Sequence, residues 1–144
     1  MKSQPEYGVD TSVAVPLLVA SHSAHSAVAA WAVGRKLGLC GHALAETYSV
    51  LTRLPGDARL GSAAAVLLID DNFPRLWMLS AETASQAHRV LAGLGVSGGA
   101  TYDGLVALAA REHNLVLVTR DARARSTYDA VGVPVEVLTD HPSN

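Results

Sequence analysis

Four of the thirteen acidic residues are placed where a carboxylate could take part in chemistry. Asp10 follows a short apolar run that ends at Val9, and Asp121 comes shortly after the apolar run Leu115 to Val118. Ligands of open α/β sheets bind beyond the carboxyl ends of the strands. Two parallel strands would therefore present both carboxylates at one edge. Burying such an acid without a partner is costly, which indicates a functional site.

The other two acids of this set fall on predicted helices. Asp103 lies in the first turn of a helix that follows a glycine-rich stretch, and Glu46 lies in mid-helix among apolar neighbours. A purely local role remains open, because Asp is a favoured helix cap and an acid in a first turn complements the helix dipole.

Four carboxylates at one sheet edge would repel each other at neutral pH unless a cation neutralised them. Mg²⁺ takes oxygen ligands and commonly binds one or two carboxylates together with water and substrate phosphate. No histidine or cysteine accompanies the set, which disfavours zinc and copper. The set formed by Asp10, Glu46, Asp103 and Asp121 therefore predicts a Mg²⁺ site, with Mn²⁺ as a possible substitute.

Polar residues beside these acids are candidates for supporting roles. Thr11, Ser12 and Thr119 could fix the carboxylates by hydrogen bonds, or they could simply form caps and turns. Arg120 could bind the phosphate of a substrate, as could the nearby Arg123 and Arg125, or these residues could be solvated.

His42 lies one turn before Glu46 on the same predicted helix face. It could approach the acidic site, although a hydrogen-bonded structural histidine is the simpler interpretation.

Short apolar runs alternate with helical segments along the chain, which predicts a parallel sheet covered by helices. Strands are expected up to Val9 and over Leu37–Cys40, Leu76–Leu79, Leu115–Val118 and Val135–Leu138. Helices are expected over Thr11–Ala20, Ser23–Lys36, His42–Leu54, Leu60–Asp71, Ser80–Leu94 and Tyr102–His113, with Thr101 as a cap, and in a last segment to about Val131. His141–Asn144 is expected to be a tail.

Composition places bounds on the class of protein. A length of 144 residues predicts one domain over residues 1–144, and 49% hydrophobic residues exclude a disordered chain. A single cysteine rules out an internal disulfide and suits a reducing cytoplasm. No segment approaches the ~18 consecutive apolar residues of a membrane helix, so no membrane association is expected. The net charge is −2, but setting aside the four acids of one metal site leaves +2, so the mild overall acidity does not exclude a phosphate-bearing substrate.

The same residues, read as motifs, resemble a known family. Val-Asp-Thr-Ser at Val9–Ser12, Glu46 in Ala-Glu-Thr-Tyr, the Tyr-Asp-Gly-Leu-Val run around Asp103, and Leu-Val-Thr-Arg-Asp ending at Asp121 are similar to a PIN domain of the VapC-type toxin ribonucleases. The resemblance covers essentially the whole chain.

The resemblance implies a PIN-like three-layer α/β/α sandwich with a central, mostly parallel sheet of about four to five strands. It implies a magnesium-dependent endoribonuclease, the toxin of a type II toxin-antitoxin module, which cleaves structured RNA (tRNA or rRNA) by metal-assisted phosphodiester hydrolysis. Asp10, Asp103 and Asp121 would ligate the metal, and Glu46 would complete the set. The implied partners are a cognate antitoxin, an RNA substrate and a second copy of the chain in a homodimer. An apolar groove at the alanine- and leucine-rich helices Ser23–Lys36 and His42–Leu54 would suit an antitoxin helix.

Three other functions compete with this prediction. A magnesium-dependent phosphatase of the haloacid dehalogenase type needs a second acid two residues after the first, where this chain has Ser12. A receiver domain needs a lysine after its last strand, and the only lysines are Lys2 and Lys36. A non-catalytic PIN-fold protein that acts through partner binding also stays open.

Overall fold

The computed structural model describes residues 5–139, and within that range five parallel strands form one sheet in the order β3-β2-β1-β4-β5. The strands are β1 (Glu6–Val9), β2 (Lys36–Cys40), β3 (Leu76–Trp77), β4 (Val116–Thr119) and β5 (Val135–Val137). Every neighbouring pair is parallel, as expected for strands joined through helices.

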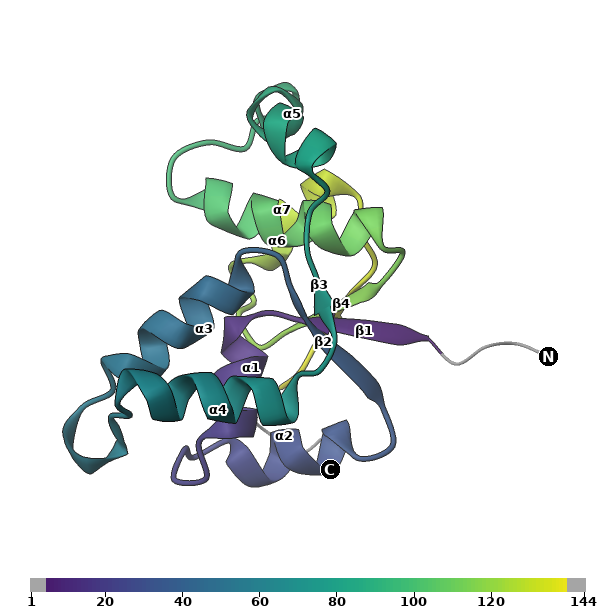
Figure 1. Ribbon diagram of the computed structural model, residues 1–144. Coiled ribbons are helices and arrows are strands. Elements are labelled where there is room, and N and C mark those ends of the chain that lie inside the picture. Colours follow the sequence, from purple (N-terminus) through teal and green to yellow (C-terminus); the bar gives the residue numbers. More distant parts are fainter. Residues whose placement is uncertain (1–4, 140–144) are drawn as a thin grey trace.

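Helices cover both faces of the sheet (Figure 1). One layer contains α1 (Thr11–Leu18), α2 (His25–Ala32), α3 (Ala43–Thr52) and α4 (Ser62–Asn72), and the short helix η1 (Gly56–Ala58) precedes α4. The opposite layer contains α5 (Ala81–Gly93), α6 (Ala100–Glu112) and α7 (Arg125–Val131). The predicted three-layer α/β/α sandwich with a parallel sheet of four to five strands is confirmed.

The centre of the sheet is fully buried because helices lie on both of its sides. Val9 of β1 pairs with Leu39 of β2 and with Val118 of β4, and all three side chains are 0% exposed. Such strands read as continuous apolar runs, which is why they were visible in the sequence. One hydrophobic core runs through both helical layers.

The predicted helix Ser23–Lys36 is too long. Helix α2 ends at Ala32, Gly34 then adopts a positive φ of 76°, and Lys36 already belongs to β2. The glycine turns the chain back towards the sheet, a conformation that glycine adopts without steric cost. The guanidinium of Arg35, just beyond the helix end, donates to the carbonyl of Trp31.

Two smaller expectations were also wrong. Helix α6 begins at Ala100, so Thr101 is its second residue and not its cap. Strand β3 is limited to two residues because it pairs only with the end of β2 at the sheet edge. The predicted tail His141–Asn144 lies outside the described residues. None of the helices within residues 5–139 combines the length and the apolar character needed to cross a membrane.

Candidate functional site

The site is built around the point where the chain leaves the sheet in two opposite directions. Strands β1 and β4 are adjacent, and the connections after them run to opposite helical layers (Figure 1). Asp10 follows β1 directly, and its backbone N–H donates to the carbonyl of Val118 on β4 at 3.2 Å. Such a switch point opens a crevice beyond the strand ends, where ligands of α/β folds bind.

Asp10 is buried, with only 6% of its surface exposed, and both of its carboxylate oxygens accept hydrogen bonds. The Ser12 hydroxyl donates to Oδ1 at 2.5 Å, and the Tyr128 hydroxyl donates to Oδ2 at 2.7 Å. Burial raises the pKa of Asp10, while the hydrogen bonds from Ser12 and Tyr128 oppose that rise. The carboxylate is therefore held in one orientation by two neighbours from different elements.

Ser12 and Thr119 connect Asp10 to Asp121. Their hydroxyl oxygens are 3.2 Å apart, the backbone N–H of Arg120 donates to the Ser12 hydroxyl at 2.7 Å, and the N–H of Asp121 donates to the Thr119 hydroxyl at 3.0 Å. The start of α1 and the turn after β4 thus form one hydrogen-bonded unit. Both hydroxyls make contacts that a supporting role would need, and the role itself stays a prediction.

Arg120 points back into the fold in these contacts. Its guanidinium donates to the carbonyl of Ser12 at 3.3 Å. Pro16, which lies inside α1, has no N–H to donate to that carbonyl in the usual helical pattern. The arginine thus takes up an acceptor that the proline leaves available.

Asp121 is only partly buried and faces an exposed arginine. The backbone N–H of Arg123 donates to Oδ1 of Asp121 at 2.9 Å, and its guanidinium Nε lies 3.3 Å from the same oxygen. The Arg123 side chain is 94% exposed. Its backbone and an ion pair with Asp121 thus hold Arg123 at the rim of the site, and most of its side chain is open to solvent. Arg125 pairs instead with Asp129 at 3.6 Å.

Glu46 reaches the site from α3 and not from mid-helix as predicted. The helix begins at Ala43, which places Glu46 in its first turn, where the residue is exposed. Gly41 sets this start: it has a φ of +52°, and a Cβ there would lie 2.9 Å from the Cβ of Ala109. The turn that leads into α3 is thus packed closely against α6.

Thr11 connects helix α1 to helix α3 by hydrogen bonds. Its hydroxyl donates to the carbonyl of Ala43 at 3.4 Å and accepts from the hydroxyl of Thr47 at 3.3 Å. Thr47 is fully buried. The helix that carries Glu46 is therefore held to the helix that follows Asp10.

All four predicted acids line one small cavity of about 60 Å³. Its walls come from α1, α3, α6, α7 and the ends of β1 and β4, and the residues are Asp10, Thr11, Ser12, Glu46, Asp103, Val106, Asp121, Ala124 and Tyr128. Asp103 is partly buried in the first turn of α6. Burial raises the pKa of Asp103, and the charges of Asp10, Glu46 and Asp121 raise it further. The acids thus lie close enough to repel one another.

The donor set suits a hard divalent cation, because it offers carboxylate and hydroxyl oxygens and no sulfur or imidazole. Within residues 5–139, however, no three acidic, histidine or cysteine side chains converge closely enough to hold an ion between them. Mg²⁺ tolerates such spacing, because it usually keeps several of its waters. The carboxylates would then bind it partly through water.

Tyr128 is the residue of this site that the sequence did not reveal. It is 1% exposed, and burial raises the pKa of its hydroxyl, with the charge of Asp10 adding to the rise. Its neighbours Thr127 and Val131 are buried as well, so the local pattern reads as an ordinary core helix. Only the packing of α7 against α6 brings the hydroxyl to Asp10, and no sequence signal could have indicated that contact.

Comparison with known proteins agrees with this geometry. A profile of the PIN domain family matches residues 7–130. Ribonuclease VapC27 of Mycobacterium tuberculosis is 56% identical over 134 residues, which cover 93% of this chain and 98% of that protein. The chain therefore belongs to the PIN domain family and, within it, to the VapC-type ribonucleases.

Solved structures show the same fold at low sequence identity. The crystal structure of Mycobacterium tuberculosis VapC20, a toxin that cleaves the sarcin-ricin loop, superposes with a TM-score of 0.64 at 20% identity and covers 84% of this chain and 94% of VapC20. DNA-bound VapBC from Salmonella typhimurium gives a TM-score of 0.62 at 17% identity, covering 96% of this chain and all of the matched one.

Proposed function

We propose that the protein is a magnesium-dependent endoribonuclease, with Mn²⁺ as a possible substitute for Mg²⁺. The observation that carries the proposal is the single cavity lined by Asp10, Glu46, Asp103 and Asp121 at the carboxyl edge of the sheet. The raised pKa of Asp103 supports it: burial is the first cause, and the charges of Asp10, Glu46 and Asp121 add a repulsion that a bound cation would relieve. The 56% identity to a ribonuclease supports RNA as the substrate class.

Asp10, Asp103 and Asp121 are the proposed metal ligands. When bound, the cation would supply Lewis-acid stabilisation of the phosphate oxygens and lower the pKa of the attacking water. Asp10 is the best-positioned ligand, since Ser12 and Tyr128 fix its carboxylate from two sides. Thr119 positions the turn that carries Asp121.

Glu46 has a different proposed role. It is the exposed member of the set and lies in the first turn of α3. An exposed carboxylate can exchange protons with solvent, so we assign Glu46 to orienting the attacking water and accepting its proton. Thr11 supports it indirectly by holding the start of α3. Arg123 rather than Arg120 is the better candidate for contact with RNA phosphate, because its side chain is 94% exposed.

The substrate is proposed to be structured RNA, either tRNA or rRNA. VapC20, which shares this fold, is a toxin that cleaves the sarcin-ricin loop. The likeness to VapC20 is at the level of fold, so the particular RNA is open to experiment.

The protein is further proposed to act as the toxin of a type II module, to form a homodimer and to be held inactive by a cognate antitoxin in the cytoplasm. The shared fold with VapBC supports this assignment. An apolar groove of about 410 Å³ lies between α3 and α4, with Leu44, Tyr48, Val66, Ile69 and Met78 among its lining residues. This groove, and not one between α2 and α3, is the proposed site for an amphipathic antitoxin helix.

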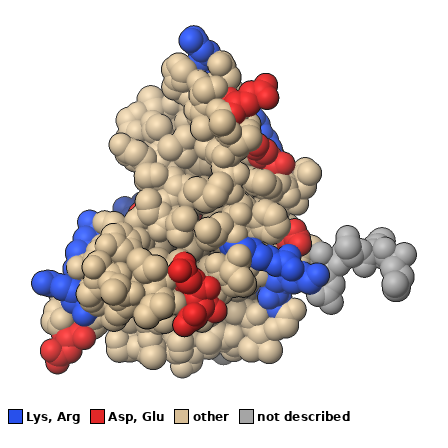
Figure 2. All heavy atoms as spheres, in the orientation of Figure 1, with Lys and Arg blue, Asp and Glu red and all other residues tan. Residues whose placement is uncertain are grey.

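The surface around this groove fits such a partner. Tyr48, Val66 and Met78 are 38%, 46% and 45% exposed, respectively. Figure 2 shows this face as largely uncharged, with an acidic patch over the end of α4 and basic groups mainly at its margins. An apolar helix face with flanking charges would bury these side chains.

RNA cleavage by the purified protein tests the catalytic proposal. The wild-type protein is expected to cut total RNA in Mg²⁺ and to stop when EDTA is added. Asp10→Asn is expected to abolish cleavage with the fold retained, while Asp57→Asn, in the exposed helix η1, serves as the matched control with full activity. Cleavage by Asp10→Asn at the wild-type rate would exclude the proposed centre. The absence of any cation-dependent cleavage by the wild-type protein would favour the non-catalytic PIN-fold alternative.

A further inference from the structure

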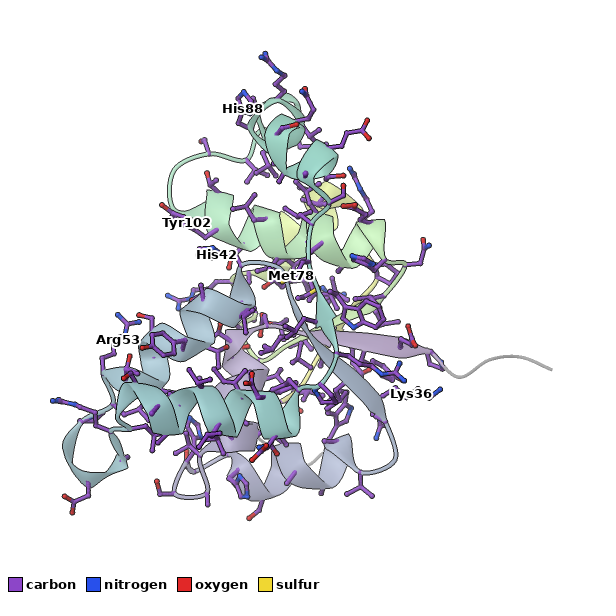
Figure 3. All side chains as sticks on the ribbon, in the orientation of Figure 1. Lys36, His42, Arg53, Met78, His88 and Tyr102 are labelled. Carbon is purple, nitrogen blue, oxygen red and sulfur yellow. The ribbon has the colours of Figure 1, made fainter. Side chains whose placement is uncertain are left out.

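Two aromatic rings stack on each other beside the acidic cavity. His42 directly precedes α3, and Tyr102 lies in the first turn of α6. Their ring centroids are 5.0 Å apart and their planes differ by 29°. Figure 3 shows the two side chains next to each other between the ends of α3 and α6. We call this pair the His42–Tyr102 stack.

The stack borders the cavity through its two neighbours in the chain. Glu46 lies one turn after His42, and its backbone N–H donates to the His42 carbonyl at 3.1 Å. Asp103 directly follows Tyr102. Both acids line the cavity, and four residues of helix rise only about 6 Å. The rings are therefore close enough to the carboxylates for roughly one nucleotide to contact both.

The contact between the turn before α3 and helix α6 does not require this stack. Gly41 in that turn lies directly on α6, since a Cβ on it would lie 2.9 Å from the Cβ of Ala109 and 3.3 Å from the carbonyl oxygen of Leu105. Tyr102 remains 55% exposed although His42 covers part of it. The Tyr102 ring is therefore held in place by His42 and still has an exposed surface that a ligand can contact.

Unpaired RNA bases bind proteins by stacking on aromatic side chains. A ribonuclease must hold a phosphate at its acids and the attached nucleotides beside them. Here the exposed Arg123 guanidinium stands beside Asp121, and the aromatic stack stands beside Glu46 and Asp103. The rim of the cavity thus offers one contact for phosphate charge and another for a flat base.

We propose that the His42–Tyr102 stack is a platform on which an unpaired base of the RNA substrate stacks next to the scissile phosphate. The proposal rests on the ribonuclease function given above and adds a positioning element to it. It favours unpaired over duplex RNA at the cut site, because only a base outside a helix offers a free face. A protein partner is the competing occupant, since His42 also borders the apolar groove.

Binding of a short fluorescein-labelled single-stranded RNA of mixed sequence tests the platform. The measurement is fluorescence anisotropy with the inactive Asp10→Asn protein in Mg²⁺, so that the RNA survives. Tyr102→Ser in this background should weaken binding about tenfold, within the range measured for the loss of one base–aromatic stack. Tyr102→Phe should retain the affinity because it keeps the ring. Tyr102→Leu should behave like Tyr102→Ser, because it is apolar but has no flat face.

An RNA of the same length with abasic sites in place of its bases separates stacking from charge. Its affinity should be the same for all Tyr102 variants, because it has phosphates but no base to stack. Thermal unfolding of each variant checks that the fold is intact, which is expected for a half-exposed position. In the active background, Tyr102→Ser should raise KM for RNA more than it lowers kcat.

Equal affinity of the Tyr102 and Tyr102→Ser proteins for the base-bearing RNA would overturn the platform. So would an equal loss of affinity for the abasic RNA, or an effect confined to binding of an amphipathic helical peptide in the α3–α4 groove. If RNA binding depends on Tyr102 but the wild-type protein cuts no RNA, the platform is supported and the proposed nuclease function is excluded. If the protein cuts RNA and Tyr102→Ser changes neither KM nor kcat, the nuclease function is supported and the platform is excluded.

Discussion

Replacing Tyr128 by Phe removes one hydroxyl and leaves the buried ring in place. That hydroxyl donates to Oδ2 of Asp10 at 2.7 Å, in a site where Asp10 is 6% and Tyr128 is 1% exposed. A hydrogen bond to a charged group contributes roughly 1.5–3 kcal/mol. Because this bond opposes the effect of burial on the Asp10 carboxyl, its loss raises the pKa of Asp10 further.

The predicted consequence is weaker binding of Mg²⁺ and little change in the chemical step. A proton on Asp10 competes with the cation, and the carboxylate is freer to turn away from the cavity. Loss of a residue that orients a metal ligand commonly weakens metal binding by about 10- to 100-fold. That range corresponds to roughly 1.4–2.7 kcal/mol, which matches the energy of the hydrogen bond.

The assay is RNA cleavage, with thermal unfolding alongside, over a series of Mg²⁺ concentrations at neutral pH. Tyr128→Phe should need about 10- to 100-fold more Mg²⁺ for half-maximal cleavage and should approach wild-type kcat at saturation. Tyr7→Phe is the matched control, because it removes a hydroxyl from the other end of β1, where the Tyr7 ring packs edge-on against Trp31 at 5.6 Å. An unchanged Mg²⁺ requirement for Tyr128→Phe would refute the view that this hydroxyl positions Asp10.

Further predictions concern repulsion, pH and backbone conformation. Asp103→Asn should raise the unfolding temperature of the metal-free protein, because burial and then repulsion by the other three acids raise the pKa of Asp103 and disfavour its charged form. The same variant should abolish cleavage. A lower unfolding temperature of Asp103→Asn in EDTA would contradict this. Burial raises the pKa of Asp10 above its ordinary 3.8, so the stability that its protonated form contributes is fully present below pH 3.8 and is lost as pH rises through the folded-state pKa. Urea unfolding in EDTA across this range should show that decline, and Asp10→Asn should lack it. Gly41→Ala should destabilise the fold by roughly 1–3 kcal/mol in urea unfolding, because Gly41 has a φ of +52° and Ala109 blocks the new Cβ. The control is Gly56→Ala: Gly56 has a φ of +63° and open space around it, so this variant measures the cost of the backbone conformation alone.

The parallel sheet was predictable because its central strands are covered on both faces. The run Leu115 to Val118 could only be a buried strand or a buried helix, and its shortness and the turn after it favoured the strand. Helix ends were less predictable, since they depend on single glycines. Gly34 ended α2 earlier than its alanine-rich composition indicated.

Three of the candidate acids stood out in the sequence because they follow strands or lie in a first turn, and Glu46 stood out as an acid among apolar neighbours on a predicted helix. Their contacts were not predictable, because side chains from α1, α6, α7 and the β4 turn meet only in the folded chain. Tyr128 is 118 residues from Asp10 in sequence, and the hydrogen bond between them depends on α7 packing against α6. The stack of His42 on Tyr102 likewise joins two segments that share no sequence signal.

The sequence by itself determined the layered α/β architecture and indicated the four acids that line the cavity, because hydrophobic periodicity and the chemistry of carboxylates are local properties. Only the tertiary structure decided how those acids are supported. It buried Asp10 between two hydroxyls, left Glu46 in solvent and turned Arg120 back to the carbonyl of Ser12. The physical reason is that burial, and with it pKa and hydrogen bonding, depends on which helices cover the strand ends.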